Sequence, residues 1–135
     1  MNGMSINVSS EMGSVPVTIF YIKGDIDSKT YEQLQAQADE AYQAGMRNLV
    51  LDLSEVNYVS SAGIRAINHI YKLLRTQAPS ESDEAVKKGI LDGSFKSPHL
   101  KLLNPKPDVS KVLKMTGVDM YIEVYRSQKD AVASF

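Results

Sequence analysis

Two adjacent serines, Ser60 and Ser61, stand directly ahead of a helical pattern in the stretch VSSAGIR. The start of a helix presents unpaired N–H groups and a partial positive charge, so one serine hydroxyl can cap it. The second hydroxyl is then left facing solvent at a place where an anion is stabilised. A phosphoryl group there would add about −1.5 to −2 charges. We therefore expect that modification at this point alters the surface and leaves the fold intact.

Gly63, close behind the two serines, has two interpretations. A small residue in the first turn of a helix permits close packing of the helix against a strand or loop. A patch without side chains beside an exposed hydroxyl would also let another protein approach that hydroxyl. Both interpretations stay open at this stage.

Catalysis by these serines is not predicted. A nucleophilic Ser61 needs a nearby base, and His69 lies eight residues further along the same helix, about 12 Å away. His99 begins a strand and belongs to the far end of the domain. The Gly-x-Ser-x-Gly pattern and Gly-rich phosphate loops are both absent, so we expect no hydrolase or nucleotidase, and no enzyme.

A receiver domain is a second alternative, because Asp52 ends a buried strand and Lys106 lies downstream. Asp25 and Asp27 would then have to hold Mg²⁺. Only one predicted helix separates them from Asp52, whereas resemblance to a receiver requires two β/α units there. We therefore expect Asp52 to cap the strand end or to face solvent.

Composition sets wider limits. A chain of 135 residues fits one domain with a core of its own. A net charge of −1 with both signs interspersed predicts no attraction to nucleic acid or to an anionic membrane. With no cysteine and two distant histidines, we expect neither a disulfide nor a metal site, and we expect no cofactor. Neither a signal peptide nor a membrane span is predicted, which favours a cytoplasmic location.

Hydrophobic periodicity predicts an α/β fold. The sheet should be mixed, with four to five strands, about four flanking helices and an N-terminal β-hairpin. The expected strands are 4–9, 15–23, 48–53, 99–104 and 120–126, with Pro16 at the start of the second one. The expected helices start at an Asp27 or Ser28 N-cap and close at Gly45, run from residue 62 to about 75, span 107–117, and fill part of 127–135.

A segment at about 76–98 interrupts this pattern and is expected to be an insertion in the single domain 1–135. Loops longer than about 12–15 residues are uncommon in compact domains, so the insertion should be mobile or carry a short helix near 83–91. It joins the far end of the second helix to the start of a strand. We therefore expect it at the pole opposite Ser61, where it does not cover that residue.

The carboxyl ends of parallel strands share one edge of a sheet, so the loops 24–28, 57–63 and 104–108 should meet there. The first turn of the second helix, with Arg65 and Asn68, would extend this surface. Tyr58 could serve there as an aromatic anchor for a partner, although core packing is an equally good explanation.

Three stretches together resemble the STAS domain family, and the resemblance spans almost the whole chain. They are KGDID at 23–27, NLVLDLSEVNYVSSAGIRAI at 48–67 and LKLLNPKPDVSKVLKMTGVDMYIEVY at 100–125. In members that act as anti-sigma factor antagonists, the resemblance implies a phosphorylatable serine at the start of the second helix. Aligning Gly63 places that serine at Ser61, with Ser60 as the alternative, standing where the family usually has Asp.

The resemblance also implies a partner-switching mechanism. The unmodified domain would bind an ATP-dependent anti-sigma factor kinase, and serine phosphorylation would release it. The loop cluster and the resemblance together give one set of candidate partner-binding residues: Asp25, Asp27, Tyr58, Ser60, Ala62, Gly63, Arg65, Asn68 and Asn104. An alternative that stays open is a STAS module for ligand sensing or scaffolding without a phosphoswitch. The sequence is also compatible with a homodimer.

Overall fold

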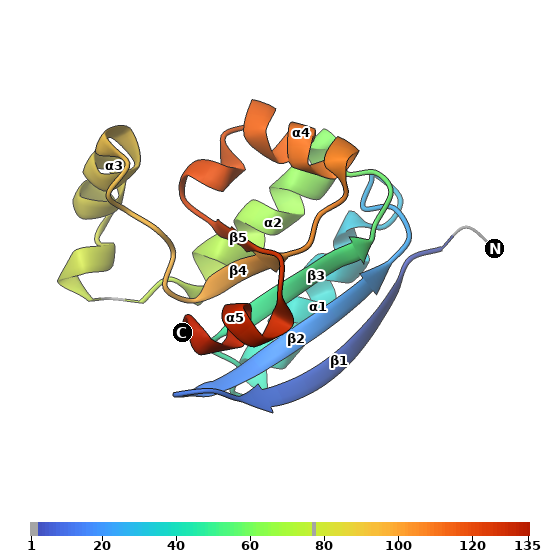
Figure 1. Cartoon of the computed structure of the whole chain (residues 1–135), viewed down its shortest axis with the longest axis horizontal. Helices are drawn as coiled ribbons and strands as arrows, with labels where there is room; N and C mark the ends of the chain where they lie inside the picture. The colour runs from blue at the N-terminus through green and yellow to red at the C-terminus, as the bar shows by residue number, and fades with distance from the viewer. Residues whose placement is uncertain (1–2, 77) are drawn as a thin grey trace.

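The computed structural model describes residues 3–76 and 78–135, and its centre is a five-stranded mixed sheet (Figure 1). The strands lie side by side in chain order and comprise β1 (Ser5–Met12), β2 (Pro16–Lys23), β3 (Leu49–Glu55), β4 (Leu100–Leu103) and β5 (Glu123–Tyr125). β1 runs antiparallel to β2, and β2 to β5 are parallel. The predicted hairpin is confirmed. Pro16 opens β2 opposite Met12, where its missing N–H interrupts no central ladder.

Five α-helices accompany the sheet in the described residues: α1 (Tyr31–Gln43), α2 (Ser61–Leu74), α3 (Asp83–Asp92), α4 (Pro107–Met115) and α5 (Gln128–Ala133). Two 3₁₀ turns, η1 (Pro79–Glu81) and η2 (Val118–Met120), complete the set. Crossover connections between parallel strands are right-handed. Because each new strand is added on the same side of the previous one, the crossovers place α1, α2 and α4 on one face. α5 lies on the other face (Figure 1).

The core follows this division into two faces. Alternate residues of the strands, such as Phe20, Leu51 and Leu102, are fully buried under α1, α2 and α4. Their neighbours on the opposite face form a smaller cluster, in which α5 covers β2, β3 and β4. That cluster contains Val17, Ile19, Val50, Leu103, Ala131 and Val132. β3 is therefore covered on both faces along most of its length, as its continuous apolar sequence predicted.

Several element boundaries differ from the prediction. β1 continues to Met12, whereas the expected strand ended at residue 9, because Glu11 and Met12 still pair with Val17 and Pro16 of β2. α1 begins at Tyr31 with Thr30 as N-cap, so the expected cap at Asp27 or Ser28 is wrong. The Asp27 carboxylate instead accepts the Lys29 N–H at 2.9 Å, and the Asp27 carbonyl accepts the Tyr31 N–H. Because the Asp27 side chain is bonded within this turn, it does not cap α1.

The last strand is shorter than expected at its beginning. The predicted first residue, Met120, lies in η2, where the Tyr121 N–H donates to the Val118 carbonyl. Gly117 has a φ of 79°, a left-handed conformation that glycine adopts without strain. The chain therefore turns once more after α4, and β5 starts only at Glu123.

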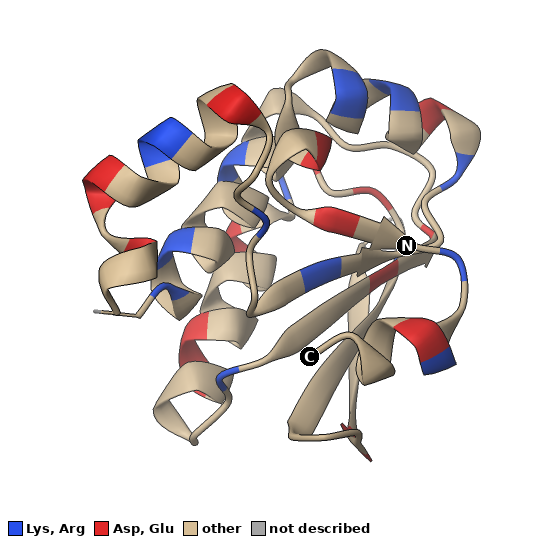
Figure 2. Cartoon of the chain, turned by 60° about the vertical axis from the view of Figure 1, so that its left-hand side comes forward, with Lys and Arg blue, Asp and Glu red and all other residues tan. Residues whose placement is uncertain are grey.

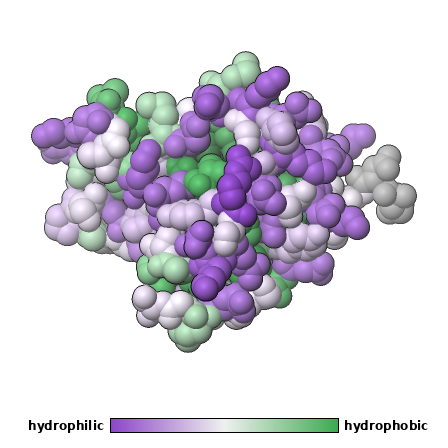
Figure 3. Space-filling model, viewed as in Figure 1, coloured by the Kyte–Doolittle hydropathy of each residue, from purple (hydrophilic) through white to green (hydrophobic). Residues whose placement is uncertain are grey.

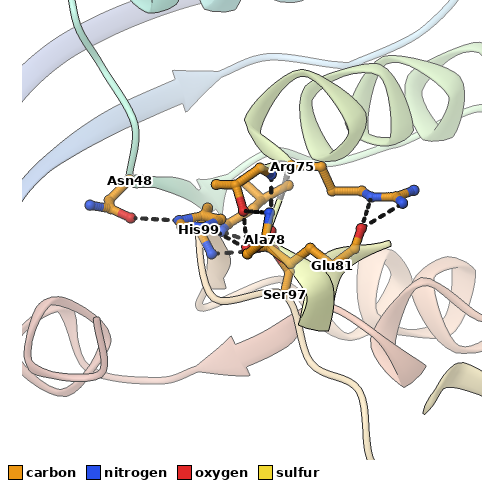
Figure 4. Close-up of polar contacts among 8 residues, drawn as sticks. Asn48, Arg75, Ala78, Glu81, Ser97 and His99 are labelled. Atoms are coloured by element: carbon orange, nitrogen blue, oxygen red, sulfur yellow. Dashed lines mark hydrogen bonds and ion pairs between the residues drawn. The ribbon is translucent and has the colours of Figure 1, made fainter. Parts of the chain in front are cut away.

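The insertion contains η1 and α3, so of the two alternatives expected for it, a mobile segment or a short helix, the structure has the short helix. It stands at the end of α2 that is remote from the carboxyl ends of β2 and β3, as predicted (Figure 1). Its anchor is the buried carboxylate of Glu81 (Figure 4). This group accepts the N–H and hydroxyl of Thr76 at 3.2 and 2.5 Å and contacts His99 Nε2 at 3.3 Å. The Arg75 guanidinium donates to the Glu81 carbonyl, and His99 Nδ1 lies 3.1 Å from Asn48 Oδ1.

Candidate functional site

The two serines occupy different positions at the start of α2. Ser60 is the N-cap, with extended backbone at φ −86° and ψ 177°, and its Oγ accepts the Gly63 N–H at 3.3 Å. Ser61 is the first helical residue and is exposed. The expected division between one capping and one outward hydroxyl is confirmed.

The first turn of α2 carries no acidic residue. The partial positive charge of the helix N-terminus is therefore not neutralised by a carboxylate of the helix itself. Arg65 lies four residues beyond Ser61, one turn further along the helix, and is exposed. An added negative charge on the Ser61 hydroxyl would meet a positive environment from its own helix.

Gly63 is buried, and its role is close packing. A Cβ at this position would lie 2.4 Å from the Ile26 carbonyl oxygen and 2.8 Å from Val59 Cγ1. Ala62 is buried as well, at 4% exposure. The expectation that these two residues contact a partner is therefore corrected, because they lie beneath the surface and hold α2 against the loop after β2.

The loops that follow β2, β3 and β4 meet at one edge, as predicted. Ile26 and Val59 form an isolated parallel bridge, and the Ser60 N–H donates to the Ile26 carbonyl at 2.9 Å. The third loop joins them through Lys106 Nζ, which donates to Asn57 Oδ1 at 2.6 Å. The position of Ser61 is thus fixed by backbone bonds to a neighbouring loop as well as by its own helix.

The remaining candidates differ in accessibility. Tyr58 is 53% exposed, so the partner-anchor interpretation is open and the core-packing one is wrong. Asn104 is exposed in a left-handed conformation, with φ 51°, and its N–H donates to the Tyr125 carbonyl. Asp25 is half-buried, and its carbonyl accepts the Thr30 hydroxyl at 2.7 Å. All three belong to the loop cluster.

Two candidates are occupied by internal contacts. The Asp27 carboxylate is engaged in the turn before α1. Asn68 is half-buried, and its Oδ1 accepts the hydroxyl of Tyr121. Burial raises the pKa of Tyr121, which outweighs the lowering effect of Asn68 and keeps the hydroxyl protonated as a donor. Asn68 therefore positions α2 against η2 and contributes less to the outer surface than expected.

Lys106 and Asn57 were missed as site residues by the sequence reasoning. Asn57 lay inside a predicted loop, but nothing in its neighbourhood indicated a partner 49 positions away. The only available signal was that both residues fall in loops expected to share one edge.

Neither histidine is placed to act as a base for Ser61. His69 Nε2 contacts Asp39 Oδ1 of α1 at 2.8 Å, and His99 belongs to the anchor of the insertion. Within residues 3–76 and 78–135, no group of three or more His, Cys, Asp or Glu side chains could hold a metal ion. The described helices also include none long and apolar enough to cross a membrane.

Charge on the molecule is mixed. Figure 2 shows basic and acidic residues interspersed over the helices and strands, without a face of one sign. The face seen in Figure 3 is mainly hydrophilic, with small separate hydrophobic patches. The electrostatic character of the surface around Ser61 therefore depends on nearby side chains and on the N-terminus of α2, and not on a large charged face.

Comparison with known proteins agrees with this arrangement. The family model described as STAS domain matches residues 11–78, half of the chain. The chain belongs to the STAS domain family. A Bordetella bronchiseptica protein, BtrV, named as an anti-sigma factor antagonist, is 31% identical over 114 residues, which cover 84% of this STAS chain and 82% of BtrV.

Solved structures show the same fold. An anti-sigma factor antagonist from Mycobacterium paratuberculosis superposes with a TM-score of 0.72 at 19% identity, covering 98% of this chain and 94% of that one. The Bacillus cell fate determinant SpoIIAA in its phosphorylated form has a TM-score of 0.57 at 19% identity, covering 93% and 96% of the two chains. The STAS fold of this chain is thus shared with proteins described as anti-sigma factor antagonists.

Proposed function

We propose that this STAS domain is an anti-sigma factor antagonist that works by partner switching, with Ser61 as the phosphorylated residue. In the unmodified state it binds an ATP-dependent anti-sigma factor kinase in the cytoplasm, and phosphorylation releases it. The domain is a substrate in this scheme and performs no catalysis itself. The observation that carries the proposal is the exposed Ser61 hydroxyl at the first position of α2, beside Ser60, which caps the helix.

The physical effect of phosphorylation follows from this position. The phosphoryl group brings about −1.5 to −2 charges to a helix N-terminus that tolerates them, so the fold is maintained. In a contact with a partner the same charge must be partly desolvated. A penalty of about 3 kcal/mol weakens binding by about 10²-fold, since about 1.4 kcal/mol corresponds to each factor of ten.

Two relatives support the assignment in general terms. BtrV is named as an anti-sigma factor antagonist, and SpoIIAA has been solved in unphosphorylated and phosphorylated forms. The acidic residue that the family usually carries one position earlier is Ser60 here. Ser60 Oγ accepts the Gly63 N–H and caps the helix, but it does not carry the charge of that acid.

The test is phosphosite mapping after incubation with ATP and the candidate anti-sigma factor kinases of the same genome. We expect incorporation at Ser61, its loss in Ser61→Ala, and its retention in Ser60→Ala. Absence of incorporation at Ser60 and Ser61 with every kinase would refute the phosphoswitch. Incorporation at Ser60 alone would assign the switch to the other hydroxyl and contradict the choice of Ser61.

Binding of the kinase provides the second readout. Ser61→Ala should bind with the affinity of the unmodified domain, and Ser61→Asp should bind at least tenfold more weakly. Ser61→Asn is the matched control, since it has the shape of Asp without its charge and should stay close to Ser61→Ala. Equal weakening by Asn and Asp would show that size, and not charge, breaks the contact.

A further inference from the structure

β1 forms an open edge of the sheet that the proposed switch does not use. Its eight residues pair with β2 along their whole length, and no other strand of the described residues pairs with its outer side. At about 3.4 Å per residue this edge is about 27 Å long. The opposite edge, β5, has three residues. On the outer side of β1, the N–H and C=O groups of alternate residues are available to a further strand.

Edge strands of this length are normally protected from pairing with other chains by charged residues, proline, a bulge or a covering segment. β1 contains no proline, and its stretch Ser5–Ser10 contains no charged residue; the one charge on the strand is Glu11, near its end. The pairing of β1 with β2 is continuous from Ser5 to Met12, without a bulge. Val8 in the middle of the strand is 49% exposed. The edge therefore combines free backbone groups with an accessible apolar side chain.

We propose that β1 pairs antiparallel with β1 of a second copy of this chain, with Val8 opposite Val8. Adjacent residue pairs of an antiparallel ladder alternate between hydrogen-bonded and non-hydrogen-bonded types, so a two-fold axis cannot lie between two pairs. It must pass midway between a residue and the same residue of the other copy. Val8 is the exposed apolar residue near the centre of the strand, and this register joins the two valines.

The positions of charged residues also favour the register with Val8 opposite Val8. With Val8 at the centre, Glu11 of one copy lies opposite Ser5 of the other, and Ser5 is itself opposite Lys23 of its own β2. Residues that are directly opposite point to the same face, so Glu11 and Lys23 flank the small Ser5 side chain. Their backbones are two strand spacings apart, about 10 Å, which two long side chains can span. The two Glu11 residues lie at opposite ends and do not repel each other.

The edge also borders a hollow that the second copy can fill. A groove of about 650 Å³ lies between the β-hairpin and the end of α1, and its lining includes Val8, Ala41 and Ala44. Val8 is opposite Phe20, whose side chain lies on the face covered by α1 and α2. In the proposed pair, the Val8 side chain of each copy faces the mouth of the other's groove. The result is a ten-stranded sheet with both helical layers on one side.

The absence of cysteine makes single-cysteine cross-linking a clean test. Under mild oxidation, unmodified chain carrying Val8→Cys should form a covalent dimer at least tenfold faster than chain carrying Leu91→Cys, whose side chain is 80% exposed on α3. Ser5→Cys controls the register, because the two Ser5 residues should lie far apart. Equal rates for Val8 and Leu91, or faster cross-linking at Ser5, would overturn the proposal.

Sedimentation equilibrium tests the pairing without cross-links. The chain should dimerise, and Val8→Lys should raise the dissociation constant of the dimer at least tenfold. Glu11→Lys and Lys23→Glu should each weaken the dimer, and the double variant should recover it. A monomer at submillimolar concentration, or a dimer unchanged by Val8→Lys, would refute the edge pairing. These measurements need no kinase, so their outcome is independent of the proposed function.

Discussion

At the scale of single residues, the first turn of α2 packs tightly against the loop after β2. Ser60 closes the helix with its side chain, and Gly63 lets the helix approach the Ile26 carbonyl. The glycine is not needed for its backbone conformation, since it lies in a helix and has no positive φ. Its value lies in the missing Cβ.

Gly63→Ala should therefore destabilise the domain. The added methyl would lie 2.4 Å from a backbone oxygen, which cannot move aside as a flexible side chain does. Overpacking typically costs about 1–3 kcal/mol, and we expect the upper end of this range as a lower free energy of unfolding in urea. Gly3→Ala is the control, because nothing lies within 4 Å of its added Cβ, and it should change the free energy by less than about 0.5 kcal/mol.

At the scale of elements, the insertion is held by polar contacts at its base and aromatic contacts beyond it. Phe95 packs edge-on against Tyr71 of α2, with ring centroids 6.4 Å apart, and Tyr71 in turn packs against Tyr121. At the base, the carboxylate of Glu81 is buried and bonded to Thr76 and His99. The insertion is thus a packed part of the domain at the pole opposite Ser61.

The anchor should be sensitive to acid. Burial raises the pKa of Glu81, but hydrogen bonds from Thr76 and the contact with His99 outweigh it and hold the pKa below the usual 4.5. A lowered pKa in the folded state means that ionised Glu81 stabilises the fold at pH values above 4.5. This contribution is lost as the pH falls through the lowered value.

Glu81→Gln removes the titrating group and keeps its shape. The variant should be less stable than the unmodified chain at pH 7, and the difference should shrink toward pH 3, as measured by urea unfolding. Hydrogen exchange of residues 78–98 should rise in parallel. Asp83→Asn is the control, since this carboxylate pairs with Arg75 in an almost fully exposed position and should show little pH-dependent difference. A pH-independent difference for Glu81→Gln would contradict the assignment.

Long elements with a clear hydrophobic period were predictable from the sequence. β3 and α2 are found where their hydrophobic patterns predicted them. Burial of a whole face allows only one arrangement in which the apolar residues point to the core. The predicted start of α1 was wrong, because the Asp27 carboxylate closes a turn through a local hydrogen bond, and this bond competes with capping of the helix. The burial of Glu81 could not be predicted, because a carboxylate in a polar loop is normally solvated. Its partner His99 is 18 positions away and is brought near only by the fold.

At the scale of the whole molecule, the two faces of the sheet are covered unequally. Three helices cover one face, and the other depends on the short α5. Ala131 of α5 is fully buried against this second face, while Ala133 is exposed. The C-terminal helix should thus contribute to global stability despite its length of six residues.

Ala131→Asp should reduce the free energy of unfolding by about 3 kcal/mol or more, because it buries a carboxylate without a partner. Ala133→Asp places the same side chain two residues later in solvent and should stay within about 0.5 kcal/mol of the unmodified chain. Thermal and urea unfolding of both variants checks this. Similar losses in the two variants would mean that disruption of the helix itself, rather than the second face, is responsible.

The identity of strand order and chain order has a consequence for synthesis on the ribosome. Each strand that emerges finds its neighbour already made, so the sheet can grow from β1 toward β5 without rearrangement. The longest interval is the synthesis of the chain between β3 and β4, because α2 and the insertion separate these strands. At about 5–20 residues per second, the 44 residues from 56 to 99 take about 2–9 s, during which the β3 edge is exposed. Chaperones that shield nascent chains should therefore act mainly within this interval.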